Sequence, residues 1–215
     1  MSLKVNEIFY GIQGESSYAG RPCVFVRLTG CNLRCSYCDT QYAYSEGQEM
    51  EIREIINRIS SYRCNLVEIT GGEPLIQKKT PALIYGLLER GFEVLLETNG
   101  TQDISKVDER CVRIIDIKCP SSGEEKKNDP GNLKRLTEKD EIKFVIGNRT
   151  DYEYAKKTLD SMNLDSSSMN TIHFSNVFGQ MHPRILAKWI LEDHLNVRLH
   201  IQLHKFIWDP EQRGV

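Results

Sequence analysis

Three cysteines, Cys31, Cys35 and Cys38, stand at Cys-x3-Cys-x2-Cys spacing in the segment Gly-Cys-Asn-Leu-Arg-Cys-Ser-Tyr-Cys-Asp-Thr at residues 30–40. Closely spaced thiolates select soft metals, which in proteins are zinc or the irons of an iron–sulfur cluster. A structural zinc site usually has four protein ligands, and no second Cys-x2-Cys pair follows. A [4Fe–4S] cluster held by three cysteines leaves one iron open to another ligand. We therefore expect such a cluster. The alternatives are a zinc site completed by a distant Cys or His, or thiols without metal.

A pair of glycines follows the next apolar strand expected along the chain. Gly-Gly-Glu-Pro at residues 71–74 comes directly after the apolar run Leu66–Ile69 and Thr70. Two glycines at a strand end let the backbone approach a ligand closely, because neither carries a Cβ. Alone, the stretch is also typical of a tight turn. Its place one strand–helix unit after the cysteines favours ligand binding.

Apolar runs that alternate with amphipathic segments must position these motifs. Helical spacing marks the amphipathic segments, as in Ile52, Ile55, Ile56 and Ile59. Strands alternating with helices predict a mainly parallel α/β sheet, either open and doubly wound or closed toward a barrel. The expected strands are Val24–Thr29, Leu66–Thr70, Glu93–Glu97, Val112–Lys118, Glu141–Ile146, Thr171–Ser175 and Arg198–Leu203, and the expected helices cover about 51–62, 79–90, 151–162 and 182–194.

Polar side chains lie on or at the ends of several expected strands. An unpaired buried charge is costly, so each should face water, a partner or a ligand. In α/β barrels the carboxyl ends of the strands form the active site, which predicts a polar cavity there. For any single residue, an edge strand or a structural ion pair is the alternative. Arg27 is the best candidate to bind a substrate carboxylate, because a guanidinium can donate two parallel hydrogen bonds. The residues concerned are Arg27, Glu68, Glu97, Asp116, Lys118, Lys143, Gln202 and His204.

Length and composition are those of an ordinary globular protein. The 215 residues suit a single domain, and a net charge of -2 gives no general attraction for nucleic acid. No apolar run approaches the roughly 18 residues of a membrane span, and no signal peptide is recognisable, so we expect a cytoplasmic protein without membrane or nucleic-acid partners. Of the seven cysteines, Cys23, Cys64 and Cys111 are expected to pack in the core. Residues 121–133 are charged and predict an exposed loop, either a lid or a disordered tip, and a short tail ends the chain.

The cysteine spacing, Tyr37 before the third cysteine, and the Gly-Gly-Glu-Pro element together resemble the radical S-adenosylmethionine superfamily. The resemblance implies a partial (β/α)6-type barrel and a [4Fe–4S] cluster whose open iron binds S-adenosylmethionine. Electron transfer into the sulfonium then yields a 5′-deoxyadenosyl radical, which is the cofactor's chemistry. Within the superfamily, a series of motifs in one order resembles the 7-carboxy-7-deazaguanine synthase family. They are Ile12–Glu15, Arg27, Cys31–Thr40, Gly71–Pro74, Glu97–Gly100, Asp116–Pro120 and Gln202–Lys205.

The resemblance implies ligands residue by residue. Cys31, Cys35 and Cys38 would hold the cluster. Thr40 would give its hydroxyl to a Mg²⁺ site beside the substrate, since Mg²⁺ seldom needs a full set of protein ligands; without the resemblance, Thr40 would be expected to cap a helix. S-adenosylmethionine would contact Tyr37, Asp39, Gly72, Glu73, Asp116, Lys118, Ser175, Asn176, Val177 and Phe178. The substrate would contact Ile12, Gln13, Gly14, Glu15, Arg27, Thr70, Glu97, Asn99 and His204.

The reaction implied by the resemblance is a radical ring contraction. It would convert 6-carboxy-5,6,7,8-tetrahydropterin to 7-carboxy-7-deazaguanine with loss of ammonia, in the biosynthesis of queuosine- and archaeosine-type 7-deazapurines. The radical would take hydrogen from C6, S-adenosylmethionine would be regenerated, and Mg²⁺ would orient the substrate carboxylate. The implied partners are the pterin, a reductant such as a flavodoxin or ferredoxin, and a second copy in a homodimer. A glycyl-radical activating enzyme or a zinc-stabilised binding module is the alternative function.

The chain departs from the family pattern at two places. Ser16-Ser17 stands where the family often has another glycine, and Asp116-Ile117-Lys118 stands where some members have Ser-Pro-Lys. Both departures lie next to expected ligand contacts.

Overall fold

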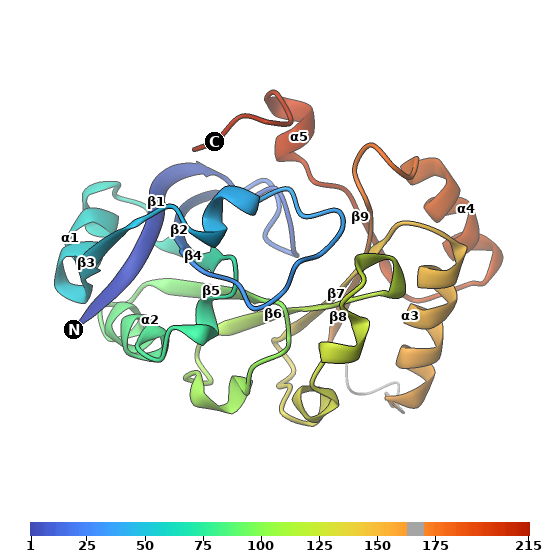
Figure 1. Cartoon of the computed structure of the whole chain (residues 1–215), viewed down its shortest axis with the longest axis horizontal. Helices are drawn as coiled ribbons and strands as arrows, with labels where there is room; N and C mark the ends of the chain where they lie inside the picture. The colour runs from blue at the N-terminus through green and yellow to red at the C-terminus, as the bar shows by residue number, and fades with distance from the viewer. Residues whose placement is uncertain (163–169) are drawn as a thin grey trace.

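One mixed sheet of nine strands forms the centre of the described structure (Figure 1). The structure is a computed structural model that describes residues 1–162 and 170–215. The strand order is β3-β1-β2-β4-β5-β6-β7-β8-β9, so the sheet is open, with β3 and β9 at its edges. All neighbours from β2 to β9 are parallel, whereas β1 is antiparallel to both β2 and β3. The strands are β1 (Ser2–Ile12), β2 (Pro22–Leu28), β3 (Gln48–Glu51), β4 (Leu66–Gly71), β5 (Glu93–Thr98), β6 (Val112–Ile117), β7 (Glu141–Ile146), β8 (Thr171–Asn176) and β9 (Arg198–His200).

Helices cover the outer face of the sheet in two groups, at opposite ends of the molecule (Figure 1). In the first group, Ile55, Ile56 and Ile59 pack with apolar residues of the neighbouring strands, which is the face that helical spacing predicts. The second group packs in the same way against β7 and β8. The helices are α1 (Ile52–Ser61) and α2 (Thr80–Leu88) in the first group, α3 (Arg149–Ser161) and α4 (Pro183–Glu192) in the second, and the short α5 (His204–Ile207) after β9.

The inner face of the sheet changes from apolar to polar along the strands. An apolar cluster fills it toward the amino ends. Successive side chains on one face of a strand are two residues apart, and the next inward position on several strands is charged. The pairs are Phe25 and Arg27 on β2, Leu95 and Glu97 on β5, and Ile114 and Asp116 on β6. The fold thus closes one end of the half-barrel with apolar side chains and leaves a polar end open.

The expected partial barrel is confirmed, and each of the seven expected strands is present. Two further strands, β1 and β3, were missed. A β-bulge between Val5 and Glu7 breaks the alternation of β1, and β3 buries only Met50, so neither gives a clear period-two signal. The last strand ends at His200, three residues earlier than expected, and His204 begins α5 instead of ending a strand.

Residues 121–133 lie at the surface, where Gly123, Lys126, Lys127 and Pro130 are exposed, but buried side chains anchor the segment to the rest of the protein. Ser122 and Asn132 are fully buried and Glu124 nearly so. Asn132 donates to the carbonyls of Gly100 (2.9 Å) and Gln102 (2.7 Å). The segment forms three 3-10 turns, η4 (Pro120–Ser122), η5 (Glu125–Lys127) and η6 (Pro130–Lys134).

Cys23 and Cys111 are buried in the core as expected, and Cys64 is partly buried against it. No helix in the described part of the chain has the length and apolar character to cross a membrane.

Candidate active site

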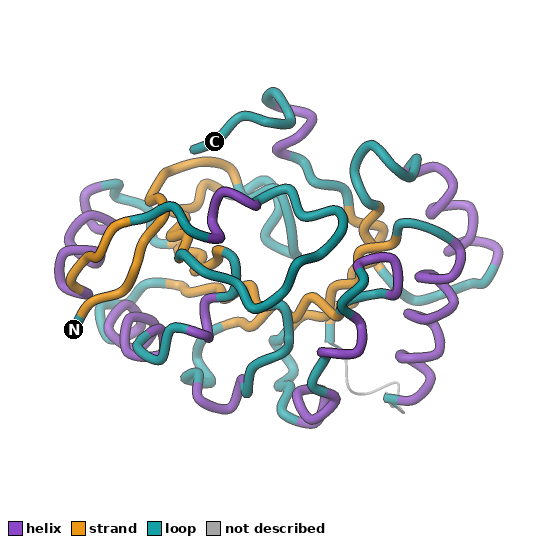
Figure 2. Tube along the Cα trace, in the orientation of Figure 1, coloured by secondary structure: helices purple, strands orange, loops and turns teal. Residues whose placement is uncertain are grey.

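The loop after β2 carries the three clustered cysteines. It crosses the middle of the molecule between the two groups of helices (Figure 2). Gly30 leaves the strand with φ 101°, a conformation that favours glycine, and the buried side chain of Leu33 anchors the loop. Cys31, Cys35 and Cys38 are each half-buried and line the same cavity.

The Gly-Gly-Glu-Pro element packs its backbone against the start of the cysteine loop. The N–H of Gly72 donates to the carbonyl of Leu28 (3.2 Å), and the N–H of Glu73 donates to that of Gly30 (2.8 Å). A Cβ on Gly72 would lie 2.2 Å from the Gly30 oxygen and 2.7 Å from the Cβ of Cys31. Only glycine at this position lets the two motifs touch.

Glu73 is not among the described residues that line the cavity, so the cavity gives no support to its expected contact with the cofactor. It is fully buried. Its carboxylate accepts hydrogen bonds from the hydroxyl of Thr98 (2.8 Å) and the backbone N–H groups of Asn99 (2.7 Å) and Leu75 (2.9 Å). Glu73 therefore ties the ends of β4 and β5 together and positions the residues that do face the cavity.

The cavity has a volume of about 820 Å³, which lies within the roughly 300–1,000 Å³ of small-molecule sites. It gathers segments from the beginning, middle and end of the chain. Except for Glu73, each residue that the sequence assigned to a ligand lines it. These are Ile12, Gln13, Gly14, Glu15, Arg27, Cys31, Cys35, Tyr37, Cys38, Asp39, Thr40, Thr70, Gly72, Glu97, Asn99, Asp116, Lys118, Ser175, Asn176, Val177, Phe178 and His204.

Lys143 is one of the polar strand residues expected at the cavity, although the sequence assigned it to no ligand, and it joins two carboxylates on the cavity wall. Its Nζ contacts Glu15 and lies 2.5 Å from Glu97, and Gln202 donates to the other oxygen of Glu15 (2.7 Å). Burial opposes the charge on Lys143, but the two carboxylates outweigh burial and hold its pKa well above the ordinary value. Burial likewise opposes the charge on Glu15, but Lys143, His200 and His204 together outweigh burial and lower that pKa. Glu97 differs from Glu15, because burial raises the pKa of Glu97 despite the nearby Lys143.

Glu68 lies near Glu15, Glu97 and Lys143 and holds Gln13. It is buried and accepts a hydrogen bond from the amide of Gln13. Burial and the nearby carboxylates of Glu97 and Glu15 raise the pKa of Glu68 well above its ordinary value. The oxygen of the Gln13 amide accepts from the N–H of Glu15 (3.0 Å), so Glu68 and Gln13 position Glu15.

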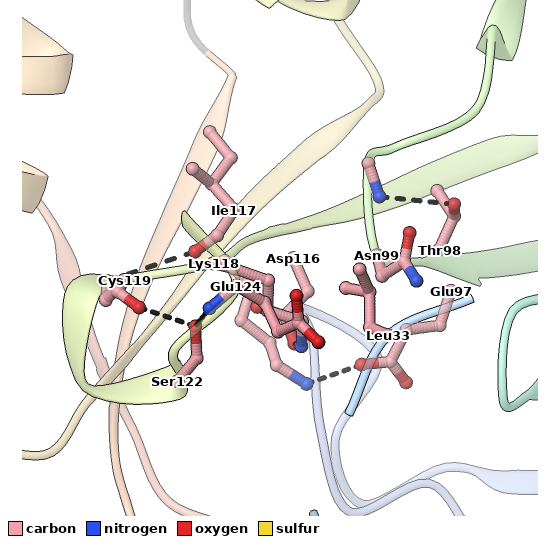
Figure 3. Close-up of polar contacts among 12 residues, drawn as sticks. Leu33, Glu97, Thr98, Asn99, Asp116, Ile117, Lys118, Cys119, Ser122 and Glu124 are labelled. Carbon is pink, nitrogen blue, oxygen red and sulfur yellow. Dashed lines mark hydrogen bonds and ion pairs between the residues drawn. The ribbon is translucent and has the colours of Figure 1, made fainter. Parts of the chain in front are cut away.

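Asp116 lies near the end of β6 and Lys118 lies just after it, and the two side chains form an ion pair of 2.7 Å. Figure 3 shows them beside Glu97 and Asn99 of the neighbouring strand end. Oδ1 of Asp116 and the hydroxyl of Tyr37 are buried and find no hydrogen-bond partner among the described residues. Such an unpaired group costs about 1–3 kcal/mol. Both residues line the cavity, where a polar ligand can satisfy them.

Arg27 is placed to bind an anion. Its Nε donates to Glu7 (2.7 Å), and its guanidinium carbon lies 5.8 Å from the ring centroid of Tyr42. Within residues 1–162 and 170–215 its Nη atoms have no hydrogen-bond partner, which leaves them for a carboxylate.

Thr40 also lines the cavity. Its hydroxyl donates to Asp39 (2.9 Å) and makes no capping bond to the turn η1 (Gln41–Tyr44), so the helix-cap interpretation is not supported. The other oxygen of Asp39 pairs with Lys205 at 2.6 Å.

The segment around α5 closes over the N-terminal part of the site. The N–H of Leu203 donates to the carbonyl of Gly14 (3.0 Å). A Cβ on Gly14 would lie 2.2 Å from Nδ1 of His204, so glycine is required for this approach. Burial lowers the pKa of His204, which favours its neutral form in the cavity.

The donor set fits an iron–sulfur cluster with a polar ligand beside it. In the described residues no three Cys, His, Asp or Glu side chains form a group able to hold a single metal ion. The three thiols instead line the wall of a wide cavity, and thiolates are the usual cluster ligands. Nδ2 of Asn99 lies 3.8 Å from Sγ of Cys31. The unpaired groups of Tyr37 and Asp116 add hydrogen-bonding capacity for the ligand.

Comparisons with known proteins agree with this architecture. The model of the radical SAM superfamily matches residues 25–163. The crystal structure of QueE from Escherichia coli overlays with a TM-score of 0.79 at 24% identity, covering 95% of each chain, and so shows the same fold. A 7-carboxy-7-deazaguanine synthase from Chlorobaculum tepidum is 47% identical over 99% of this chain and 97% of the relative. One from Koribacter versatilis is 43% identical over 99% of this chain and 100% of the relative.

A partial parallel barrel whose open end carries a Cys-x3-Cys-x2-Cys loop defines a radical S-adenosylmethionine protein. Within that class, the chain belongs to the 7-carboxy-7-deazaguanine synthase family. The resemblance seen in the sequence is confirmed. These relatives support neither the glycyl-radical activating enzyme nor the zinc-stabilised module.

Proposed function

We propose that this chain catalyses the conversion of 6-carboxy-5,6,7,8-tetrahydropterin to 7-carboxy-7-deazaguanine with loss of ammonia. The observation that carries the proposal is the meeting, in one cavity, of the three clustered thiols with the free edge of Arg27 and with Glu15, Lys143 and Glu97. When bound, the cluster and S-adenosylmethionine supply a 5′-deoxyadenosyl radical that takes hydrogen from the substrate. The residues of the chain bind and orient both ligands.

The cofactor half of the site is the end of the barrel near the cysteine loop. Cys31, Cys35 and Cys38 hold the cluster, and the bare backbone at Gly72 lets the cofactor approach. The unpaired oxygen of Asp116 accepts from the cofactor's hydroxyl or amino groups. Ser175, Asn176, Val177 and Phe178 form the adjoining wall.

The substrate half combines one cation with two carboxylates. Arg27 donates both Nη atoms to the substrate carboxylate. Glu15 and Glu97 accept from the N–H groups of the pterin ring, and Lys143 holds both carboxylates in place. His204, with its lowered pKa, is a neutral hydrogen-bond partner or proton acceptor above the ring.

Mg²⁺ is assigned to Thr40. Thr40 lines the cavity, and one protein oxygen with substrate and water ligands is a common Mg²⁺ arrangement. Thr40→Ser, which keeps the hydroxyl, should retain stimulation by Mg²⁺, and the isosteric Thr40→Val should lose it. Product formation during a Mg²⁺ titration compares the two.

The proposal extends to the domain organisation, location, oligomeric state and electron donor of the enzyme. All 215 residues act as one radical SAM domain, in the cytoplasm, as a homodimer. A flavodoxin or ferredoxin supplies the electron, and neither nucleic acid nor membrane takes part.

An anaerobic assay tests the proposed function. The chain is reconstituted with iron and sulfide, then incubated with reductant, S-adenosylmethionine, Mg²⁺ and the pterin, and products are identified by mass spectrometry. A deazaguanine carboxylate with little net loss of S-adenosylmethionine supports the proposal. If the cluster forms but only 5′-deoxyadenosine accumulates, the substrate assignment is wrong; if no cluster forms with the thiols reduced, the cluster assignment is wrong.

A further inference from the structure

Residues that follow β6 fasten the cysteine loop on both sides of Cys35. The N–H of Arg34 donates to Oε1 of Glu124 (2.6 Å). The N–H of Ser36 donates to the carbonyl of Ser122 (3.1 Å), and its hydroxyl donates to the carbonyl of residue 121 (2.7 Å). Three hydrogen bonds therefore hold the two residues that flank the second cysteine of the motif.

The segment that receives these bonds is itself held firmly. Ser122 is fully buried, and its N–H and hydroxyl both donate to the carbonyl of Cys119 (3.0 and 2.6 Å). The N–H of Glu124 donates to the Ser122 hydroxyl (3.0 Å), as Figure 3 shows. Ser121 donates its N–H (2.8 Å) and its hydroxyl to Asp151, a buried residue in the first turn of α3. The bonds therefore run without interruption from the cysteine loop to a helix.

Glu124 is the side chain of this segment that reaches the cysteine loop. Its residue is 8% exposed, and its second oxygen pairs at 2.8 Å with Lys127, whose side chain is 54% exposed. An exposed ion pair of that kind contributes little. A carboxylate that accepts a partly buried backbone N–H makes a stronger, charge-assisted bond. The contact to Arg34, and not the one to Lys127, is therefore the one that fixes the loop.

We propose that Glu124 is a positioning residue for the iron–sulfur cluster: with Ser121 and Ser122 it fixes the backbone around Cys35, so that the thiol stands ready for iron. The inference rests on the cluster site of the proposed function. Partners that orient metal ligands typically contribute about 10–100-fold to metal affinity or activity. The charged segment after β6 then serves the cluster.

Cluster stability, measured without substrate or S-adenosylmethionine, tests this inference. Wild type, Glu124→Ala, Glu124→Gln and Lys127→Ala are reconstituted anaerobically, assayed for iron and sulfide, and characterised by EPR after reduction. A chelator is then added, and loss of cluster absorbance is followed. We expect E124A to lose its cluster about tenfold faster than wild type. E124Q, which keeps an acceptor for the Arg34 N–H, should stay within about threefold, and K127A should match wild type.

The outcomes separate this inference from the function on which it rests. A stable wild-type cluster and an E124A protein with the wild-type loss rate and EPR signal would overturn the inference alone. A wild-type chain that builds no cluster would overturn both. If circular dichroism shows that E124A does not fold, Ser36→Ala is the second variant, because this exposed change removes only the hydroxyl bond to the carbonyl of residue 121. It should lose the cluster about threefold faster, and a wild-type rate would overturn the inference.

Discussion

The carboxylate of Glu141 accepts two hydrogen bonds from Ser17, one from its N–H at 3.0 Å and one from its hydroxyl. Two residues further along the same strand, Lys143 holds Glu15. Strand β7 thus holds the segment before β2 through two of its side chains, Glu141 and Lys143. Ser16, between Glu15 and Ser17, has φ 61°, a conformation that costs a non-glycine residue roughly 1–2 kcal/mol. It persists because both neighbours are fixed.

The hydrogen bonds from Ser17 to Glu141 predict an effect on substrate binding. Glu141→Leu removes both acceptors of Ser17, so the segment that carries Glu15 should loosen. We expect the KM for the pterin to rise about tenfold, which corresponds to about 1.4 kcal/mol of lost binding. Cleavage of S-adenosylmethionine without substrate should stay unchanged. Steady-state kinetics and a 5′-deoxyadenosine assay measure the two.

Glu141→Gln is the matched control. It keeps an acceptor for Ser17 and a partner for His173, whose Nε2 lies 2.7 Å from Glu141. Its KM should stay within about threefold of wild type. A folded E141L protein with the wild-type KM would show that the contact between Glu141 and Ser17 does not help to position the substrate.

Lys143 should be essential for stability as well as binding. Lys143→Met leaves Glu15 and Glu97 facing each other without a cation, and removal of one partner from a buried ion pair costs about 3–5 kcal/mol. We expect the free energy of unfolding, measured with denaturant at pH 7, to fall by about 3 kcal/mol. The triple variant K143M/E15Q/E97Q should recover most of the loss and still form no product. A single variant within about 1 kcal/mol of wild type would contradict the ion-pair assignment.

His200 predicts how stability depends on pH. Burial lowers its pKa to about 4, although Glu15 opposes this, and neither ring nitrogen finds a partner in the described structure. An unfolded histidine binds its proton near pH 6.5, whereas the folded one binds it only near pH 4. Between these values the unfolded state holds more protons, so stability falls as pH falls from about 6.5 toward 4. The loss should be about 2 kcal/mol between pH 7.5 and pH 5.

Denaturant unfolding at the two pH values isolates this contribution. His200→Phe cannot take up a proton and should remove that part of the pH dependence. The exposed His194, changed to Asn, is the control and should leave the dependence as in wild type. Equal pH dependence in H200F and wild type would refute the assignment.

Gly72 should tolerate no side chain. The Cβ of Gly72→Ala would overlap the Gly30 carbonyl and the Cβ of Cys31, and forcing the two motifs apart should cost about 1–3 kcal/mol. We expect a lower melting temperature and less iron per reconstituted chain. Gly86→Ala, within α2, meets only the flexible side-chain ends of Ile56 at 3.1 Å and Arg90 at 3.8 Å and should be neutral or stabilising. A G72A protein with full iron and wild-type melting would contradict the close packing.

The features that the sequence predicted best are motifs made of residues close together in the chain. The cysteine spacing and the two glycines are contiguous motifs that end expected strands, and the structure brings both to one cavity. The sequence did not predict Glu73 as a structural residue, since its three hydrogen-bond donors come from β5 and from the residue after next. Nor did it predict the pairing of Lys143, because both carboxylate partners are more than 40 residues away.

Composition predicted only part of the structure of residues 121–133. Charge together with Gly, Asn and Pro is typical of exposed loops. Here Asn132 and Ser122 turn inward and satisfy backbone groups of other segments, a role that depends on tertiary neighbours. Ser16 shows the converse case. The chain has Ser16-Ser17 where the resemblance leads one to expect a glycine, and the left-handed φ of Ser16 is one that glycine adopts without strain.

Deuterium transfer tests most directly whether this cavity brings an adenosyl radical to C6 of the pterin. The reconstituted chain is given 6-carboxytetrahydropterin labelled with deuterium at C6, and S-adenosylmethionine and 5′-deoxyadenosine are recovered for mass spectrometry. We predict deuterium in the recovered S-adenosylmethionine, together with unlabelled cofactor in a Cys35→Ala control that forms no product. Product formation with no deuterium in either adenosyl compound, or product formed equally by C35A, would contradict the radical mechanism at this site.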